Sequence, residues 1–154
     1  MATILREPTA GYLVWRLSMR WRAKVDRAVA PYGLTHATYS VLASLYGQTQ
    51  AGTNPSQRHL ADITGMDAVY ISKLVRSLER DGLVRRAPDP DDTRAVKLTL
   101  SRLGQARISK AIDTVSALHD ELLAPLGGPQ SPASRQFKGA LARLLNDPTP
   151  GGMT

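Results

Sequence analysis

The fold is decided by residues 56–100, which read SQRHLADITGMDAVYISKLVRSLERDGLVRRAPDPDDTRAVKLTL. Two helical patterns, over about 57–64 and 67–81, are separated by Gly65, a residue that readily takes the positive φ found just after a helix end. Each pattern follows a side chain that can cap a helix N-terminus. The predicted caps are Ser56 or Asn54 for the first helix and Asp67 for the second. The stretch therefore begins as a helix, a tight turn and a helix.

The second of these helices has an apolar back and a basic, hydroxyl-bearing front. Because successive residues turn by about 100°, one side carries Ile71, Leu74, Val75 and Leu78. The opposite side carries Val69, Lys73, Arg76 and Arg80, flanked by Tyr70 and Ser72. The major groove of DNA admits one α-helix, and a helix with this pattern meets that requirement.

A β-hairpin follows the two helices. Strands are expected over 83–87 and 94–100, because the second alternates apolar and polar residues. Between them, the sequence PDPDDT at 88–93 is rich in residues that favour turns. A helix-turn-helix followed by a hairpin predicts a winged helix.

Four further helices are predicted around this stretch, over 9–30, 36–47, 102–124 and 132–145. Each carries apolar side chains at helical spacing. The expected fold class is therefore mainly α, an α+β winged helix-turn-helix with six helices and a two-stranded β-hairpin wing.

The composition is that of an ordinary globular protein and excludes several classes of function. The 154 residues carry a net charge of +7 and no cysteine, which excludes disulfides, thiolate metal sites and thiol redox sensing. No apolar run could span a bilayer and the first residues lack a signal-peptide pattern, so we expect a cytoplasmic protein. A basic protein suits a polyanionic partner, yet residues 56–100 hold eight Lys or Arg against seven Asp or Glu. The prediction of DNA binding therefore depends on which faces of the protein carry the charges, and not on the total charge.

Ten residues are predicted to contact DNA. They are Ser56, Gln57, Arg58, Tyr70, Ser72, Lys73, Arg76, Arg86, Asp92 and Arg94. The helix beginning after Ser56 can offer backbone N–H groups to a phosphate, whereas Lys73 lies near enough to its own helix start to reach a base edge. Arg94 can enter the minor groove while Asp92 holds it extended, and Arg86 lies where it can bind the DNA backbone.

The stretch from Leu60 to Gly104 resembles the MarR (multiple antibiotic resistance regulator) family. The most specific matches are LERDGLVRR at 78–86, DPDDTR at 89–94 and LSRLG at 100–104. Upstream, YGLTHATYSVLASL at 32–45 resembles the junction between the family's first two helices. The resemblance covers about residues 11–145, with small departures at His59, where Glu is common, and Ser101, where Thr is usual.

The resemblance implies a transcription regulator, a repressor, that binds a palindromic operator on double-stranded DNA as an obligate homodimer. It implies a DNA-binding lobe at 35–100, a helical dimerisation region at 9–34 and 101–147, and flexible tails at 1–8 and 148–154. The apolar stripes of the outer helices agree with a dimer, because a chain of this length has little core to cover them all.

The resemblance also implies a cleft for a small aromatic or phenolic effector, between the dimer helices and the winged lobe. The residues that could line this cleft are Tyr12, Trp15, Met19, His36 and Tyr39. Ordinary core and dimer packing explains the same cluster equally well, so both interpretations stay open.

Neither a cofactor, a metal site nor an enzyme active site is expected. The three histidines, His36, His59 and His119, share no short ligand spacing and no cysteine accompanies them. The sequence contains no Gly-rich phosphate loop, nucleophile elbow or paired-carboxylate motif. The remaining alternative is a winged helix that contacts protein, or coats DNA without an operator. A protein-binding face would be apolar, whereas the front of the second helix is basic.

Overall fold

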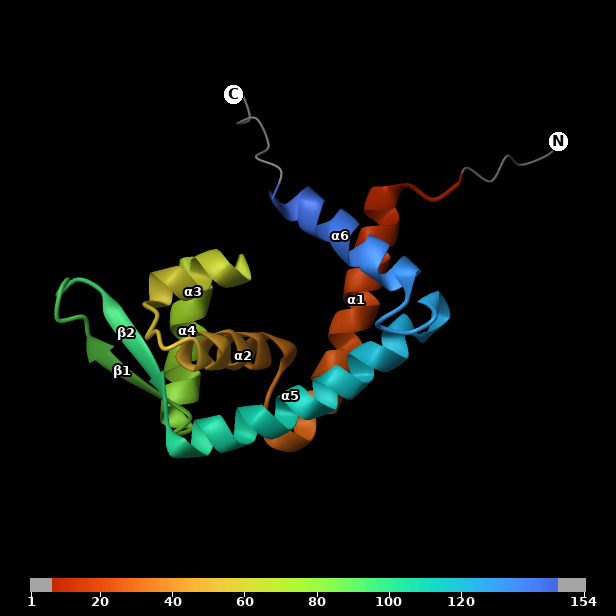
Figure 1. Cartoon of the computed structure of the whole chain (residues 1–154). Coiled ribbons are helices and arrows are strands. Elements are labelled where there is room, and N and C mark those ends of the chain that lie inside the picture. The colour runs from red at the N-terminus through yellow and green to blue at the C-terminus, as the bar shows by residue number, and fades with distance from the viewer. Residues whose placement is uncertain (1–6, 147–154) are drawn as a thin grey trace, which may run out of the picture. The chain divides into compact units, whose positions relative to one another are not determined.

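The computed structural model describes residues 7–146 and confirms a mainly helical winged-helix fold (Figure 1). Its elements are α1 (Ala10–Val29), η1 (Ala30–Tyr32), α2 (His36–Gln50), α3 (Gln57–Thr64), α4 (Ala68–Arg80), β1 (Val84–Pro88), β2 (Val96–Leu100), α5 (Arg102–Leu123), η2 (Ala124–Leu126) and α6 (Pro132–Asn146). The predicted tails at 1–8 and 148–154 lie outside the described residues, apart from Glu7 and Pro8. The chain divides into two compact units after Val115.

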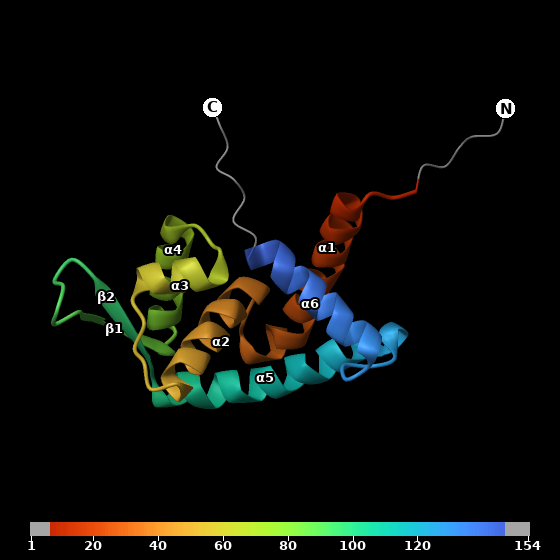
Figure 2. The same cartoon turned by 45° about the horizontal axis from the view of Figure 1, so that its top comes forward.

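The core of the first unit lies among α2, α3, α4 and the hairpin, which pack against one another (Figure 2). Its wholly buried side chains come from these elements and from α1 and the start of α5. The largest are Leu42, Leu45, Leu60, Ile71, Leu78, Leu83, Leu98 and Ile108. Burial of this apolar surface is the main favourable contribution to folding, and it fixes the helices that carry the predicted DNA contacts.

Side-chain caps fix the helix-turn-helix as the sequence predicts. Ser56 Oγ accepts a hydrogen bond from the N–H three residues on at 3.1 Å, and Gly65 ends α3 with a φ of 69°. Asp67 Oδ1 accepts hydrogen bonds from the N–H groups of Val69 and Tyr70 at 2.9 and 3.2 Å. These bonds satisfy N–H groups that a helix start leaves unpaired, and they set the direction of the first turn of α4.

The two strands of the wing pair antiparallel, with Val84 opposite Leu100 and Pro88 opposite Val96. β1 begins one residue later than expected, because the N–H of Leu83 bonds back to the carbonyl of Leu78 at 2.9 Å and closes α4. β2 begins two residues later than expected, because Arg94 belongs to the turn instead.

The wing is also bonded to the residues just before α3. The N–H of Leu98 donates to the carbonyl of Pro55 at 3.0 Å, and Ser56 forms an isolated β-bridge with Lys97. These contacts hold the start of α3 beside the hairpin, although the two segments lie about forty residues apart in sequence.

The start of α5 is seated closely on the end of α4. Ser101 Oγ accepts the N–H of Gly104 at 2.9 Å and donates to the carbonyl of Gly82 at 2.5 Å. A side chain at Gly104 would meet the backbone of Leu83, with a Cβ 2.9 Å from its carbonyl carbon and closer still to the oxygen. Glycine at this position therefore permits the close approach.

The second unit contains the end of α5, η2 and α6. The expected break between the helices is present, where Gly127 and Gly128 have φ values of 91° and 92°. Ser131 Oγ accepts the N–H of Ser134 at 3.1 Å and caps α6. Near the end of α6, Leu144 and Leu145 are 73% and 84% exposed.

Candidate DNA interface

The front of α4 is exposed, as the helical pattern predicts. Lys73, Arg76 and Arg80 lie along one side of the helix, while Ile71 and Val75 on its back are wholly buried. Within residues 7–146, neither Lys73 nor Arg76 takes part in an ion pair. Their charges are thus available to a phosphate.

Two further α4 residues predicted to contact DNA lie beside this front. Tyr70 is 43% exposed and Ser72 is half-buried. Both are in the first half of α4, the part of a reading helix that contacts bases. Val69, in the same turn, is 65% exposed and is not among the ten predicted DNA contacts.

The start of α3, the start of α4 and the wing surround one hollow of about 780 Å³. Its lining residues are Ser56, Gln57, Arg58, Ala68, Asp92, Arg94, Ala95 and Val96. Five of the ten predicted DNA-contacting residues are thus brought together from segments far apart in sequence. The main-chain hydrogen bond from Leu98 to Pro55 and the β-bridge between Ser56 and Lys97 hold these segments together.

Arg94 projects from the wing turn with its side chain 93% exposed. Asp92 Oδ1 accepts the backbone N–H of Arg94 at 3.0 Å and lies 3.6 Å from its Nε. The turn is closed further by Asp89, whose Oδ1 accepts the N–H of Asp91 at 2.9 Å and whose Oδ2 lies 4.0 Å from Lys97 Nζ. The carboxylate of Asp92 therefore lies where it can orient Arg94.

Arg86 on β1 has a partner that the sequence analysis missed. Its Nε donates to Glu79 Oε2 at 2.7 Å, and both side chains are about one-third exposed. A helix-to-strand pair of this kind has no short-range sequence signature. The ion pair orients the guanidinium, and contact of Arg86 with DNA stays a prediction.

The five residues predicted to line an effector cleft fall into two groups. Tyr12 and Trp15 are exposed near the start of α1, with ring centroids 6.3 Å apart, and Met19 is 54% exposed one turn further on. His36 instead lies at the start of α2, where its N–H donates to Asp26 Oδ1 at 2.5 Å. Because a helix rises about 1.5 Å per residue, Asp26 is roughly 16 Å along α1 from Trp15.

Burial affects the titration of the second group. It lowers the pKa of His36, an effect that Arg22 strengthens and Asp26 opposes. Burial also raises the pKa of Tyr39. The imidazole of His36 and the phenol of Tyr39 are therefore uncharged near neutral pH, which favours packing against apolar or neutral surfaces.

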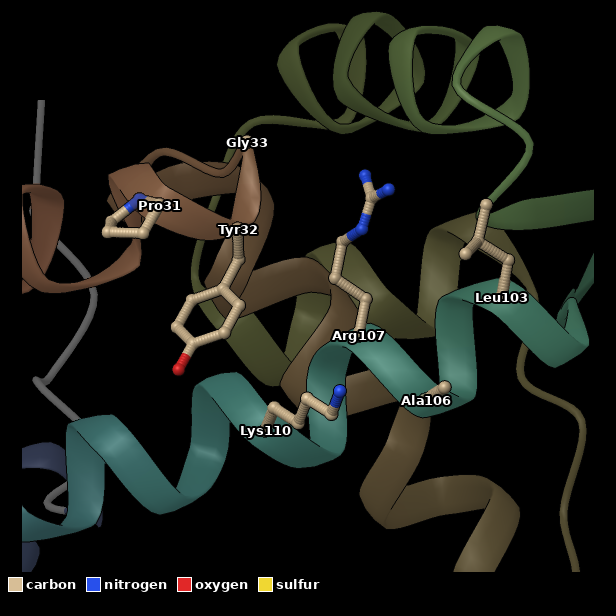
Figure 3. A pocket seen from close by; sticks show the side chains of 7 residues that line it. All are labelled: Pro31, Tyr32, Gly33, Leu103, Ala106, Arg107 and Lys110. Atoms are coloured by element: carbon tan, nitrogen blue, oxygen red, sulfur yellow. The ribbon is translucent and has the colours of Figure 1, made fainter.

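A separate cavity of about 420 Å³ lies between η1 and the start of α5 (Figure 3). Arg107 and Lys110 extend from α5 into the same region as the ring of Tyr32, whose hydroxyl lies 2.6 Å from Thr114 Oγ1. None of the five predicted effector residues lines this cavity. No motif in the sequence pointed to it, because it depends on the packing of η1 against α5.

Residues 7–146 contain no group of three or more His, Cys, Asp or Glu side chains placed to hold a metal ion. In the same range, no helix has both the length and the apolar character needed to cross a membrane.

A basic reading helix, a capped helix start beside it and an arginine-tipped wing define a winged helix-turn-helix protein of the DNA-binding class. Comparisons with known proteins agree. A family model described as MarR family matches residues 32–95. The HTH-type transcriptional regulator YdcH of Bacillus subtilis is 30% identical over 74% of this chain and 78% of its own length.

Two further relatives extend the match. The HTH-type transcriptional repressor Rv2887 of Mycobacterium tuberculosis is 31% identical over 89% of this chain and 94% of its own length. A Staphylococcus aureus MepR–DNA complex superposes with a TM-score of 0.79 at 25% identity, covering 90% of this chain and 98% of that one. The chain therefore belongs to the MarR family of DNA-binding transcriptional regulators, which act without catalysing a reaction.

Proposed function

We propose that this regulator is a repressor, which binds a palindromic operator as a homodimer and blocks access of the polymerase. The observation that carries the proposal is the hollow shared by α3, α4 and the wing, because it collects groups suited to phosphates, bases and the minor groove. The relative Rv2887, which is named a repressor, supports the direction of control. We place this activity in the cytoplasm, where a bacterial regulator meets its DNA.

Exposed apolar side chains support the homodimer. The first half of α1 exposes Tyr12, Leu13, Val14, Trp15, Leu17 and Met19 by 38–58% each. Leu144 and Leu145 on α6 are more exposed still. Several large apolar side chains exposed on one helix are typical of a protein–protein interface, and a second copy of the chain would cover them.

A two-fold dimer sets the geometry of the operator. Two reading helices entering successive major grooves on one side of the duplex lie about 34–36 Å apart, which is one turn of DNA. With the wings reaching outward, the site spans roughly 16–20 base pairs, and its two halves repeat with inverted symmetry.

Footprinting on the DNA beside the protein's own gene tests the proposal. We expect one discrete protected stretch of about two DNA turns with an inverted repeat. The matched variant is Lys73→Ala with Arg76→Ala, two exposed substitutions that should remove the footprint and preserve the thermal unfolding midpoint. Even protection along the fragment would favour the architectural alternative, and no protection at any concentration would refute the operator.

We further propose that a small aromatic anion releases the operator. Two places could bind such an anion. One is the exposed pair Tyr12 and Trp15, where Arg16 lies above the Tyr12 ring. The other is the cavity that Arg107 and Lys110 border. Release requires that the effector bind the free and DNA-bound conformations with different affinity.

Fluorescence can distinguish the two places. The chain has two tryptophans, Trp15 and Trp21, so Trp21→Phe leaves Trp15 as the sole reporter. Titration with 4-hydroxybenzoate should quench Trp15 if the effector binds at α1. Release of DNA that is abolished by Arg107→Gln, without quenching, would assign the effector to the cavity beside α5. No release by 4-hydroxybenzoate in either variant would contradict the proposal for this ligand.

A further inference from the structure

Val69 is an exposed apolar side chain in the middle of a polar, basic helix face. It is the second residue of α4, and 65% of it is exposed. Lys73, Arg76 and Arg80 lie within about 40° of it around the helix axis. Val69 therefore points the same way as these cations, two of which, Lys73 and Arg76, are among the predicted DNA contacts.

Folding of the chain does not account for a valine here. The core side of α4 is filled by Ile71, Val75 and Leu78, which are wholly or almost wholly buried. Valine is also a weaker helix former than the unbranched residues that an exposed helix position usually favours. The side chain thus contributes little packing to the free protein, and less helix propensity than an unbranched residue would.

The local structure holds the Val69 side chain ready for contact. Its N–H is capped by Asp67 Oδ1 at 2.9 Å, which fixes the first turn of α4. A β-branched side chain within a helix keeps essentially one χ1 rotamer. Its two methyl groups are consequently presented in one orientation and lose little conformational freedom on binding.

The major groove offers one apolar group to such a side chain. Base edges there carry hydrogen-bond donors and acceptors, together with the 5-methyl group of thymine. The N-terminal residues of a reading helix are the ones that meet base edges, which is where Val69 stands. We propose that Val69 packs against a thymine 5-methyl group in each half-site and so selects thymine at that operator position.

This inference rests on the proposed operator binding, and uracil substitution isolates it. Deoxyuridine differs from thymidine only in lacking the 5-methyl group, so base pairing and the phosphate backbone are preserved. Each thymine of the footprinted operator is replaced in turn, and the Kd is measured by fluorescence anisotropy at one fixed salt concentration. We expect sensitivity at one symmetry-related pair of thymines. Uracil in one half-site should raise the Kd about fourfold, and uracil in both half-sites about fifteenfold, because each substitution removes one buried methyl group.

Val69→Ala supplies the decisive comparison. This variant should bind the thymine and uracil operators equally at that position, and the wild type should lose its advantage only there. Val69→Ile should keep the uracil sensitivity. Ile63→Ala is the matched control, because Ile63 is a 44% exposed apolar residue near the end of α3 that is not among the predicted DNA contacts, and this variant should leave the sensitivity unchanged.

Two outcomes would overturn the inference. Uracil sensitivity that persists in Val69→Ala would assign the methyl contact to another side chain such as Tyr70, and the absence of any sensitive thymine would remove the contact altogether. In both cases the operator would still be bound, so failure of the inference is distinguishable from failure of the proposed function, in which no discrete footprint exists.

Discussion

Gly104 packs against the backbone of Leu83, and replacing it with alanine should destabilise the protein. The new Cβ would lie 2.9 Å from the carbonyl carbon of Leu83 and 3.1 Å from its Cα. Side-chain carbons are not found that close to backbone, so α5 or the residues after α4 must move. Leu83 cannot yield freely, because its side chain is wholly buried and its carbonyl accepts the N–H of Ser101 at 3.0 Å.

The size of the effect follows from these contacts. Forced repacking of a core costs about 1–3 kcal/mol. Weakening the hydrogen bond from Ser101 adds about 1 kcal/mol. Alanine in a helix returns about 1 kcal/mol of propensity, which leaves a net loss of about 2 kcal/mol for Gly104→Ala.

Urea unfolding followed by circular dichroism, at one fixed protein concentration, measures this loss. Gly47→Ala is the matched control, because Gly47 is also within a helix but has nothing within 4 Å of its would-be Cβ. That substitution should stabilise the protein by up to about 1 kcal/mol. Equal or greater stability of Gly104→Ala relative to the wild type would refute the close approach of α5 to Leu83.

Three further predictions concern DNA binding, assembly and pH. Arg94→Ala should weaken operator binding and reduce the slope of log K against log salt by about one unit per protomer; anisotropy titrations with an unchanged slope would argue against a DNA contact. Trp15→Glu should shift the mass measured by light scattering from dimer to monomer, and an intact dimer would show that this part of α1 lies outside the interface. Burial lowers the pKa of His36 and of His119, so the unfolded state takes up protons first as pH falls below about 6.5. The thermal midpoint should therefore fall between pH 7.5 and 5.5 and level off below the folded-state pKa values, and His36→Gln with His119→Gln should flatten this profile.

Local signals in the sequence predicted the fold well. Ser56 and Asp67 each cap the helix that was expected to follow them. These features involve neighbours within three residues, and such short-range chemistry is written directly in the sequence. The hairpin was predicted for the same reason, since its turn residues and alternation are local.

Features that depend on distant segments could not be predicted. The ion pair between Arg86 and Glu79 joins a strand to a helix, and the bond from Leu98 to Pro55 joins the wing to the chain before α3. The cleft predicted for Tyr12, Trp15, Met19, His36 and Tyr39 depends in the same way on how separate helices pack, and it stays a prediction. The sequence shows that Val69 lies on the polar face of its helix. Its exposure suggests a role only once the structure shows that other residues fill the core.

The carboxylates of the wing turn also affect how tightly the protein binds DNA that lacks the operator. Asp89, Asp91 and Asp92 precede the one arginine in the turn at the tip, so this turn attracts phosphates weakly unless Arg94 enters a narrow groove. With residues 56–100 close to electrical balance, loose association with random sequence gains little from bulk charge. The protein then discriminates against the many competing sites of a genome through a low affinity for non-specific DNA as much as through a high affinity for the operator.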